Sequence, residues 1–171
     1  MELYAKNMFF QGNTIEEKEY DYCIHGNVVF KIGDNLLSNE KEWCVSASAY
    51  KFLCTLFKNH FMEDGDFLIP CCGHFIIISD DKKIEKIMGC NSGIDFNVIH
   101  GKSDIIIKTE DNIEYNIPFI DYKNAVLSFA KQVIDFYKLN SERKFTDEYD
   151  KEGYNLFIAE LNSLYNKAKL I

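Results

Sequence analysis

The stretch FIIISDDKKIEKIM, residues 75–88, places two apolar runs, 75–78 and 84–88, on either side of a short polar turn at 79–83. A connection this short joins antiparallel strands, because parallel strands need a crossover of about a dozen residues or more. The stretch therefore predicts a β-hairpin. Facing residues in this hairpin have numbers that add up to 162 or 163, which places Cys72 opposite Cys90 or its neighbour.

Further short apolar runs surround this hairpin. They lie at 67–69, 96–99, 105–107 and 113–117, and small polar connections follow most of them. These connections are also too short for crossovers, so the runs predict one antiparallel β-meander. The aromatic and β-branched run at 20–32 predicts either two short strands or one kinked strand.

Helical spacing of apolar residues occurs in three segments. One is expected from Ser46, a suitable N-cap, to about Asn59. Two more follow Pro118, on either side of a charged loop at 138–150. We therefore expect an α+β fold: one meander sheet, one helix inserted early, and two C-terminal helices packed on one face. No linker is visible, so residues 1–171 are expected to form a single domain, with residues 1–19 as a loosely ordered N-terminal segment.

Charge and composition narrow the function. The chain has 27 acidic against 19 basic residues, a net charge of −8, which disfavours nucleic acid as a partner. The basic residues are lysines apart from Arg143, so bidentate anion clamps of the arginine type are scarce. No leader and no apolar run of the roughly 20 residues that cross a bilayer are visible, which predicts a cytoplasmic protein without membrane contact.

The densest group of reactive side chains is PCCGH, residues 70–74, followed by Cys90. Cysteine is often buried as a small hydrophobe, and packed strand cysteines are the favoured interpretation. One alternative is a zinc site made by Cys72, His74 and Cys90, since zinc accepts sulfur and nitrogen ligands. Another is a thiol-dependent enzyme in which His74 serves Cys71 or Cys72 as a base.

Two other polar residues of this region are candidates without an assigned role. Asp95 and His100 are five positions apart, so they face opposite sides of a regular strand and should not form a dyad. A turn or capping role is expected for each. No catalytic motif with an established spacing occurs, so the sequence favours a non-enzymatic protein and no cofactor.

Acidic residues gather in the expected turns and loops. Glu63, Asp64 and Asp66 form one group, and Glu110 and Asp111 form another. Such groups attract a basic protein by electrostatic steering, which raises the association rate more than the affinity. These five residues are the candidate partner-binding site, and the alternative is that they serve solubility.

An ordered series of short motifs resembles a known group of proteins. It consists of WCVS at 43–46, PCCGH at 70–74, GCNSGID at 89–95 followed by Val98 and His100, and FAKQV at 129–133 followed by Phe136 and Tyr137. The series is similar to small acidic bacterial immunity proteins that accompany polymorphic toxins. The resemblance implies a protein that binds and blocks a cognate toxin, often a basic nuclease, inside the producing cell. It assigns a role to no single residue.

The leading hypothesis is therefore a non-enzymatic cytoplasmic binding protein, an immunity-type inhibitor of a basic toxin. Two alternatives stay open at the level of sequence: the zinc-binding or thiol-dependent enzyme centred on residues 71–74 and 90, and a structural or self-assembling module. The oligomeric state is left open.

Overall fold

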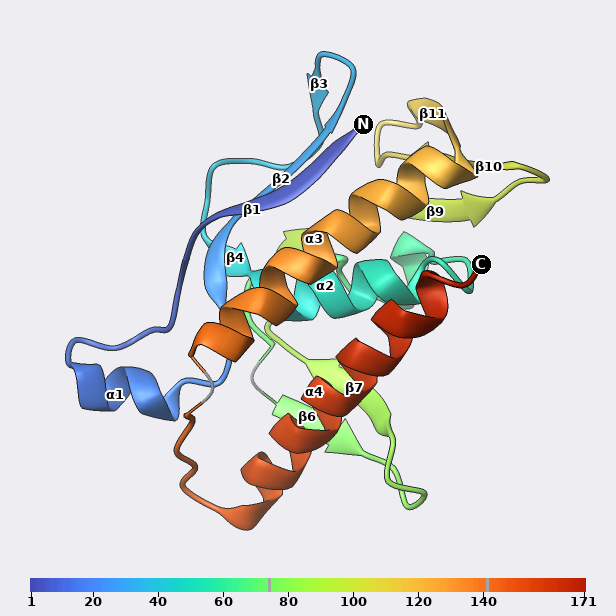
Figure 1. Ribbon diagram of the computed structural model, residues 1–171. Helices are drawn as coiled ribbons and strands as arrows, with labels where there is room; N and C mark the ends of the chain where they lie inside the picture. Colours follow the sequence, from blue (N-terminus) through green and yellow to red (C-terminus); the bar gives the residue numbers. More distant parts are fainter. Residues whose placement is uncertain (74, 141) are drawn as a thin grey trace.

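The computed structural model describes residues 1–73, 75–140 and 142–171. It combines helices with antiparallel strands and ends in two long helices, which confirms the α+β class and the two C-terminal helices (Figure 1). The elements are β1 (Glu2–Phe9), α1 (Ile15–Tyr20), β2 (His25–Ile32), β3 (Asn35–Leu36), β4 (Trp43–Cys44), α2 (Val45–Cys54), the 3₁₀ helix η1 (Met62–Asp64), β5 (Ile69–Pro70), β6 (Phe75–Ile78), β7 (Ile84–Met88), β8 (Gly93–Ile94), β9 (Asn97–His100), β10 (Asp104–Lys108), β11 (Glu114–Pro118), α3 (Phe119–Leu139) and α4 (Glu148–Ala168).

The strands form several small sheets, so the expectation of one meander sheet is wrong. Among the described residues, β1, β3 and β4 pair with β2, β9 and β11 flank β10, β5 pairs with β8, and β6 pairs with β7. Helices come between these sheets: α2 contacts both β2 and β5, and α3 contacts both β1 and β10. Figure 1 shows α3 running alongside β1, while α4 covers the β6–β7 hairpin.

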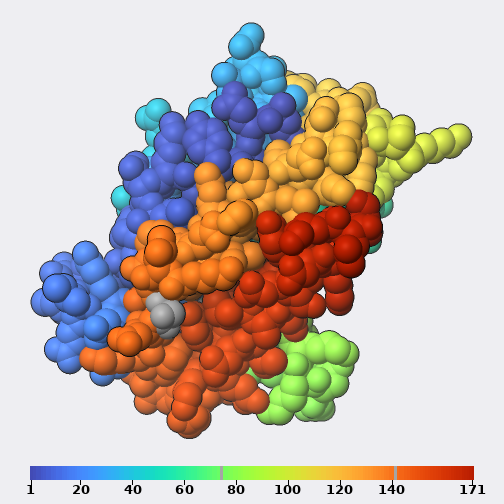
Figure 2. Space-filling model, in the orientation of Figure 1, coloured from blue at the N-terminus to red at the C-terminus, as the bar shows by residue number. Residues whose placement is uncertain are grey.

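The β6–β7 hairpin has the expected register. Phe75 faces Met88 and Ile76 faces Ile87, pairs whose numbers add up to 163, and a bulge shifts the last pair to 162. The β5–β8 pairs Ile69 with Ile94 and Pro70 with Gly93 add up to 163 as well. Both sheets are thus parts of one long antiparallel ladder, which is interrupted between them. Figure 2 shows the tip of this hairpin, in light green, protruding at the edge of the molecule beside α4, where Lys82 of the tip pairs with Glu152 of α4 at 2.5 Å.

The N-terminal segment differs from the expectation of loose order. Its residues 2–9 form β1, which pairs with β2 from Glu2 opposite Lys31 to Phe9 opposite His25. The side chain of Leu3 is buried in the core, and the Ala5 amide donates to the Gln132 side chain of α3 at 2.9 Å. Pairing with β2 and packing under α3 order this segment.

The first long helix starts and ends earlier than expected. α2 begins at Val45, so Ser46 lies inside the helix and is not its N-cap. The Ser46 hydroxyl instead accepts a hydrogen bond from the Ile24 amide at 3.1 Å, which ties α2 to the chain entering β2. The segment 20–32 contains one strand, β2, preceded by the end of α1.

The core is built around aromatic rings. Phe30 of β2, Phe52 of α2 and Phe96 pack with ring centroids 4.9 to 6.1 Å apart, and Phe129 of α3 contacts Phe52 edge to face at 6.0 Å. All four are fully buried. The α3 and α4 faces expected from the periodicity, including Val126, Val133, Phe157 and Leu161, are buried against this core.

Arg143 holds the loop between α3 and α4 against the N-terminal region. Its guanidinium lies 3.8 Å from the ring centroid of Phe10 and donates hydrogen bonds to the carbonyls of Lys18 and Asp21 at 2.8 and 3.1 Å. Within the described part of the chain, no helix combines the length and apolar character needed to cross a membrane.

Candidate functional site

Two of the expected acidic loops meet at one edge of the molecule. Met62, the first residue of η1, donates its amide hydrogen to the Asn97 side-chain oxygen at 2.8 Å. Asn97 pairs with Lys108, the last residue before the β10–β11 turn. The loop carrying Glu63 and Asp64 and the turn carrying Glu110 and Asp111 therefore both attach to the Asn97 end of β9. We call these four exposed carboxylates the acidic edge.

The acidic edge is available to a partner. No ion pair engages its four carboxylates among the described residues, whereas nearby Glu114 pairs with Lys108 at 3.4 Å. Ile113, in the same turn as Glu110 and Asp111, is 51% exposed and adds an apolar contact point beside the charges. Protein interfaces combine an apolar centre with a polar rim, and Ile113 with the surrounding carboxylates could supply both on a small scale.

Asp66 does not belong to this edge. Its carboxylate pairs with the ammonium of Lys51 on α2, which also donates to the Phe67 carbonyl at 2.9 Å. The Lys51 side chain is 9% exposed and that of Asp66 is 42% exposed. Asp66 therefore neutralises a nearly buried cation, which leaves its charge less available to a partner than the charges of the acidic edge.

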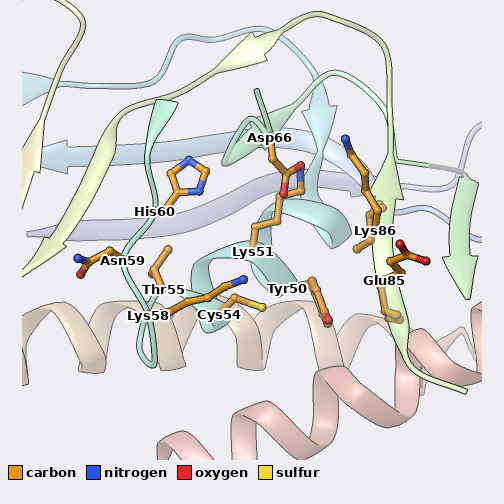
Figure 3. A pocket seen from close by; sticks show the side chains of 12 residues that line it. Tyr50, Lys51, Cys54, Thr55, Lys58, Asn59, His60, Asp66, Glu85 and Lys86 are labelled. Carbon is orange, nitrogen blue, oxygen red and sulfur yellow. The ribbon is translucent and has the colours of Figure 1, made fainter. Parts of the chain in front are cut away.

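A cleft of about 250 Å³ lies between the C-terminal half of α2 and the β7 strand (Figure 3). Its lining mixes the cations Lys51, Lys58 and Lys86 with the carboxylates Asp66 and Glu85. Small-molecule sites usually measure about 300 to 1,000 Å³ and converge a few polar groups on one ligand. The cleft is smaller and carries charges of both signs, so it does not define a substrate.

Asp95 and His100 have different partners, as their spacing predicts. The Asp95 carboxylate lies 2.8 Å from His60 Nε2 and accepts from the Leu68 amide at 3.2 Å. His100 Nε2 lies 2.7 Å from the Thr55 carbonyl at the end of α2 and therefore donates to it. Both residues tie β9 and its approach to the segment after α2, which is a positioning role.

His60, which pairs with Asp95, also lines the cleft described above. Among the described lining residues, neither Cys54 nor Thr55 is available to it as a reactive nucleophile. Burial raises the pKa of the Cys54 thiol to about 11, so this thiol is protonated at neutral pH. A thiol attacks as its thiolate, which is scarce here. The Thr55 hydroxyl is engaged with the Phe52 carbonyl and the Tyr122 hydroxyl.

The cysteine cluster forms where the long ladder is interrupted. The Cys90 amide donates to the Cys72 sulfur at 3.0 Å, which confirms the expected apposition of these two residues. Hydrogen bonds from the thiols of Cys72 and Cys71 hold the pKa of Cys90 below its usual range. The bond to Cys90 raises the pKa of Cys71, and desolvation raises that of Cys72.

The metal interpretation of this cluster stays a prediction. His74, the third residue of the candidate set with Cys72 and Cys90, lies outside the described residues. Among the residues that the structure does describe, no group of three or more His, Cys, Asp or Glu side chains is arranged to hold a metal ion.

The sequence did not indicate that two more cysteines lie beside this cluster. The buried thiol of Cys23 donates to the Gly73 carbonyl at 3.2 Å. Interaction with the neighbouring Cys44 thiol, together with burial, raises the pKa of Cys23 well above its usual value. The Cys44 sulfur would lie 3.2 Å from a Cβ placed at Gly73. No spacing rule links positions so far apart along the chain, so only the folded structure brings them together.

Comparison with other proteins adds no assignment to these sites. No family model, curated protein sequence or solved structure matches this chain.

Proposed function

We propose that this chain is a non-enzymatic binding protein, an immunity-type inhibitor that occludes a basic toxin inside the cell that produces both. The observation that carries the proposal is the acidic edge, in which two loops far apart in the sequence attach to the same residue, Asn97. Its carboxylates point to a partner of opposite charge, and the resemblance described above supplies the class of partner.

The proposed mechanism is electrostatic capture followed by steric block. Exposed carboxylates that are not neutralised by the chain's own lysines attract a cationic surface over about a Debye length, which is near 10 Å at 0.1 M salt. Association then proceeds faster than for neutral surfaces, and the gain falls with ionic strength. Ile113 contributes apolar contact beside the charges. No bond is made or broken in this mechanism.

The test needs a basic toxin domain as the partner, and the genes that flank the gene of this chain are the place to look for it. Association rates are measured by stopped flow at low and high salt for Glu63→Lys/Asp64→Lys and for Glu110→Lys/Asp111→Lys. The matched control is Asp80→Lys/Asp81→Lys, an equal charge change in the exposed β6–β7 turn. We expect each edge variant to associate about tenfold more slowly at low salt, with a smaller difference at high salt, and the control to change much less.

Two outcomes would count against the proposal. Equal association rates for all three variants would remove the acidic edge as the contact surface. Toxicity of the basic domain that is unchanged by co-expression of the wild-type chain would remove the inhibitor function itself.

A further inference from the structure

The interrupted ladder of the long hairpin holds a second feature that the proposed function does not use. The β5–β8 and β6–β7 pairs share one register, yet they are separated by residues 71–74 on one strand and 89–92 on the other. Among the described residues of this gap, the Cys71 amide donates a hydrogen bond to the Ser92 carbonyl at 2.9 Å. Three cysteines of the chain occupy the gap.

The cysteines in the gap lie close together. The Cys72 sulfur accepts a hydrogen bond from the Cys90 amide at 3.0 Å, and a Cβ placed at the neighbouring Gly89 would lie 3.6 Å from the same sulfur. Cys90 is exposed to solvent and Cys72 is half-buried beneath it. A small solvent-borne reagent therefore reaches Cys90 directly, and the thiol of Cys72 is already beside the atom that would be modified.

We propose that Cys90 and Cys72 form a dithiol site for hydroperoxides, in which Cys90 is oxidised first and Cys72 then closes a disulfide with it. The Cys90 sulfur attacks the terminal peroxide oxygen, the O–O bond breaks, and the leaving oxygen takes the thiol proton. This step yields a sulfenic acid on Cys90 and water or an alcohol.

The second step joins the two strands. The Cys72 sulfur attacks the Cys90 sulfur, the S–O bond breaks, and hydroxide leaves with the Cys72 thiol proton as water. In total two thiols lose two electrons and two protons, and the hydroperoxide is reduced to water and an alcohol, or to two waters. A disulfide needs the sulfur atoms about 2.05 Å apart, which side-chain rotation brings within reach for residues already in hydrogen-bond contact.

Cys72 is the resolving residue because of its place in the ladder. Cys72 is held against Cys90 by the hydrogen bond from the Cys90 amide. Cys71, its neighbour on the same strand, is exposed, so its thiol can rotate into solvent and is less well placed to react with Cys90. The thiols of Cys23 and Cys44 are buried, which keeps them from the reagent. A bond from Cys72 to Cys90 spans the gap, so it would couple the β5–β8 and β6–β7 halves of the hairpin into one unit.

The experiment maps the bond directly. The full-length chain is treated with hydrogen peroxide, quenched, alkylated with N-ethylmaleimide, digested with trypsin and analysed by mass spectrometry without reductant. Cleavage after Lys58, Lys82, Lys86 and Lys102 separates the peptide 59–82, which carries Cys71 and Cys72, from the peptide 87–102, which carries Cys90. We expect these two peptides to be joined, and to separate on reduction.

Serine variants assign the partners. Cys72→Ser and Cys90→Ser should both lose the cross-link, and Cys72→Ser should accumulate a sulfenic acid on Cys90 that dimedone traps. Cys71→Ser and the remote control Cys54→Ser should keep the cross-link. Circular dichroism of each variant verifies that it is folded.

Three results would overturn the assignment: a cross-link that survives Cys72→Ser, a cross-link lost in folded Cys71→Ser, or oxidation of Cys54 as fast as that of Cys90. These experiments do not measure toxin binding. The dithiol site and the proposed inhibitor function are therefore tested independently of each other.

Discussion

The His60 imidazole lies 2.8 Å from the carboxylate of Asp95, although the two residues are 35 positions apart in the chain. Their side chains are 12% and 8% exposed, so this contact is shielded from water. The same Asp95 oxygen accepts the Leu68 amide at 3.2 Å. One carboxylate thus joins the segment after α2, the start of β5 and the approach to β9.

Replacing Asp95 with alanine should lower the free energy of unfolding by about 2 to 3 kcal/mol, because two buried donors lose their charged acceptor. Urea denaturation followed by circular dichroism measures the change. Asp80→Ala removes an exposed aspartate from the β6–β7 turn and should alter stability by less than about 0.5 kcal/mol. Equal effects of the two variants would show that Asp95 contributes no more than a surface residue.

Asp66→Ala should destabilise the chain by about 1 to 2 kcal/mol, since it leaves the nearly buried Lys51 without its counter-charge. This loss of stability is smaller than that expected on breaking a fully buried ion pair, because the Asp66 carboxylate is half-exposed and screened by water. A double-mutant cycle with Lys51→Met measures the coupling. Asp66→Ala should leave the association rate of the proposed toxin complex nearly unchanged, unlike the acidic-edge variants; a slowing as large as theirs would return Asp66 to the contact surface.

Stability should decline at alkaline pH through Cys54. Burial raises its pKa to about 11 in the folded chain, above the value in the unfolded chain. The folded state therefore holds this proton more tightly, and the contribution is complete below the unfolded pKa and is lost as pH rises through about 11. Relative to Cys54→Ala, the wild type should lose about 2 kcal/mol between pH 7.5 and 10.5, measured by urea denaturation. Parallel pH profiles for the two proteins would contradict this expectation.

Gly73→Ala should destabilise the chain by about 1 to 3 kcal/mol through overpacking. A Cβ at this position would lie 2.8 Å from the Ala47 Cβ on α2 and 3.3 Å from the Ile87 side chain, and neither neighbour is a flexible side-chain end. Combining it with Ala47→Gly should recover part of the loss beyond additivity, because the second change removes the closest atom. Thermal denaturation of the four proteins of this cycle measures the coupling, and strict additivity would place the strain elsewhere.

Sequence patterns predicted the elements whose partners lie nearby in the chain. The β6–β7 hairpin and its register followed from a short turn between two apolar runs, and so did the contact between Cys72 and Cys90. The faces of α3 and α4 followed from helical periodicity. In each case the determining interaction spans a few turns of helix or one hairpin.

The features that escaped prediction depend on long-range contacts. β1 has weak alternation and a bulge near Asn7, whose φ is 51°, and its order comes from β2 and from Gln132 of α3. The strands belong to separate sheets, and α2 and α3 each contact strands of two of these sheets that lie far apart in the sequence. The contact of His60 with Asp95 likewise has no local pattern.

The contacts that Arg143 makes with the N-terminal region have a practical consequence. Arg143 is the single arginine of the sequence, and it is held by the Phe10 ring and two carbonyls of the N-terminal region. A protease specific for arginine therefore has one peptide bond to cut. It can cut this bond only when Arg143 leaves the Phe10 ring and the two carbonyls. The rate of that single cleavage therefore measures how often the loop between α3 and α4 opens, and it can be followed on a gel without any label.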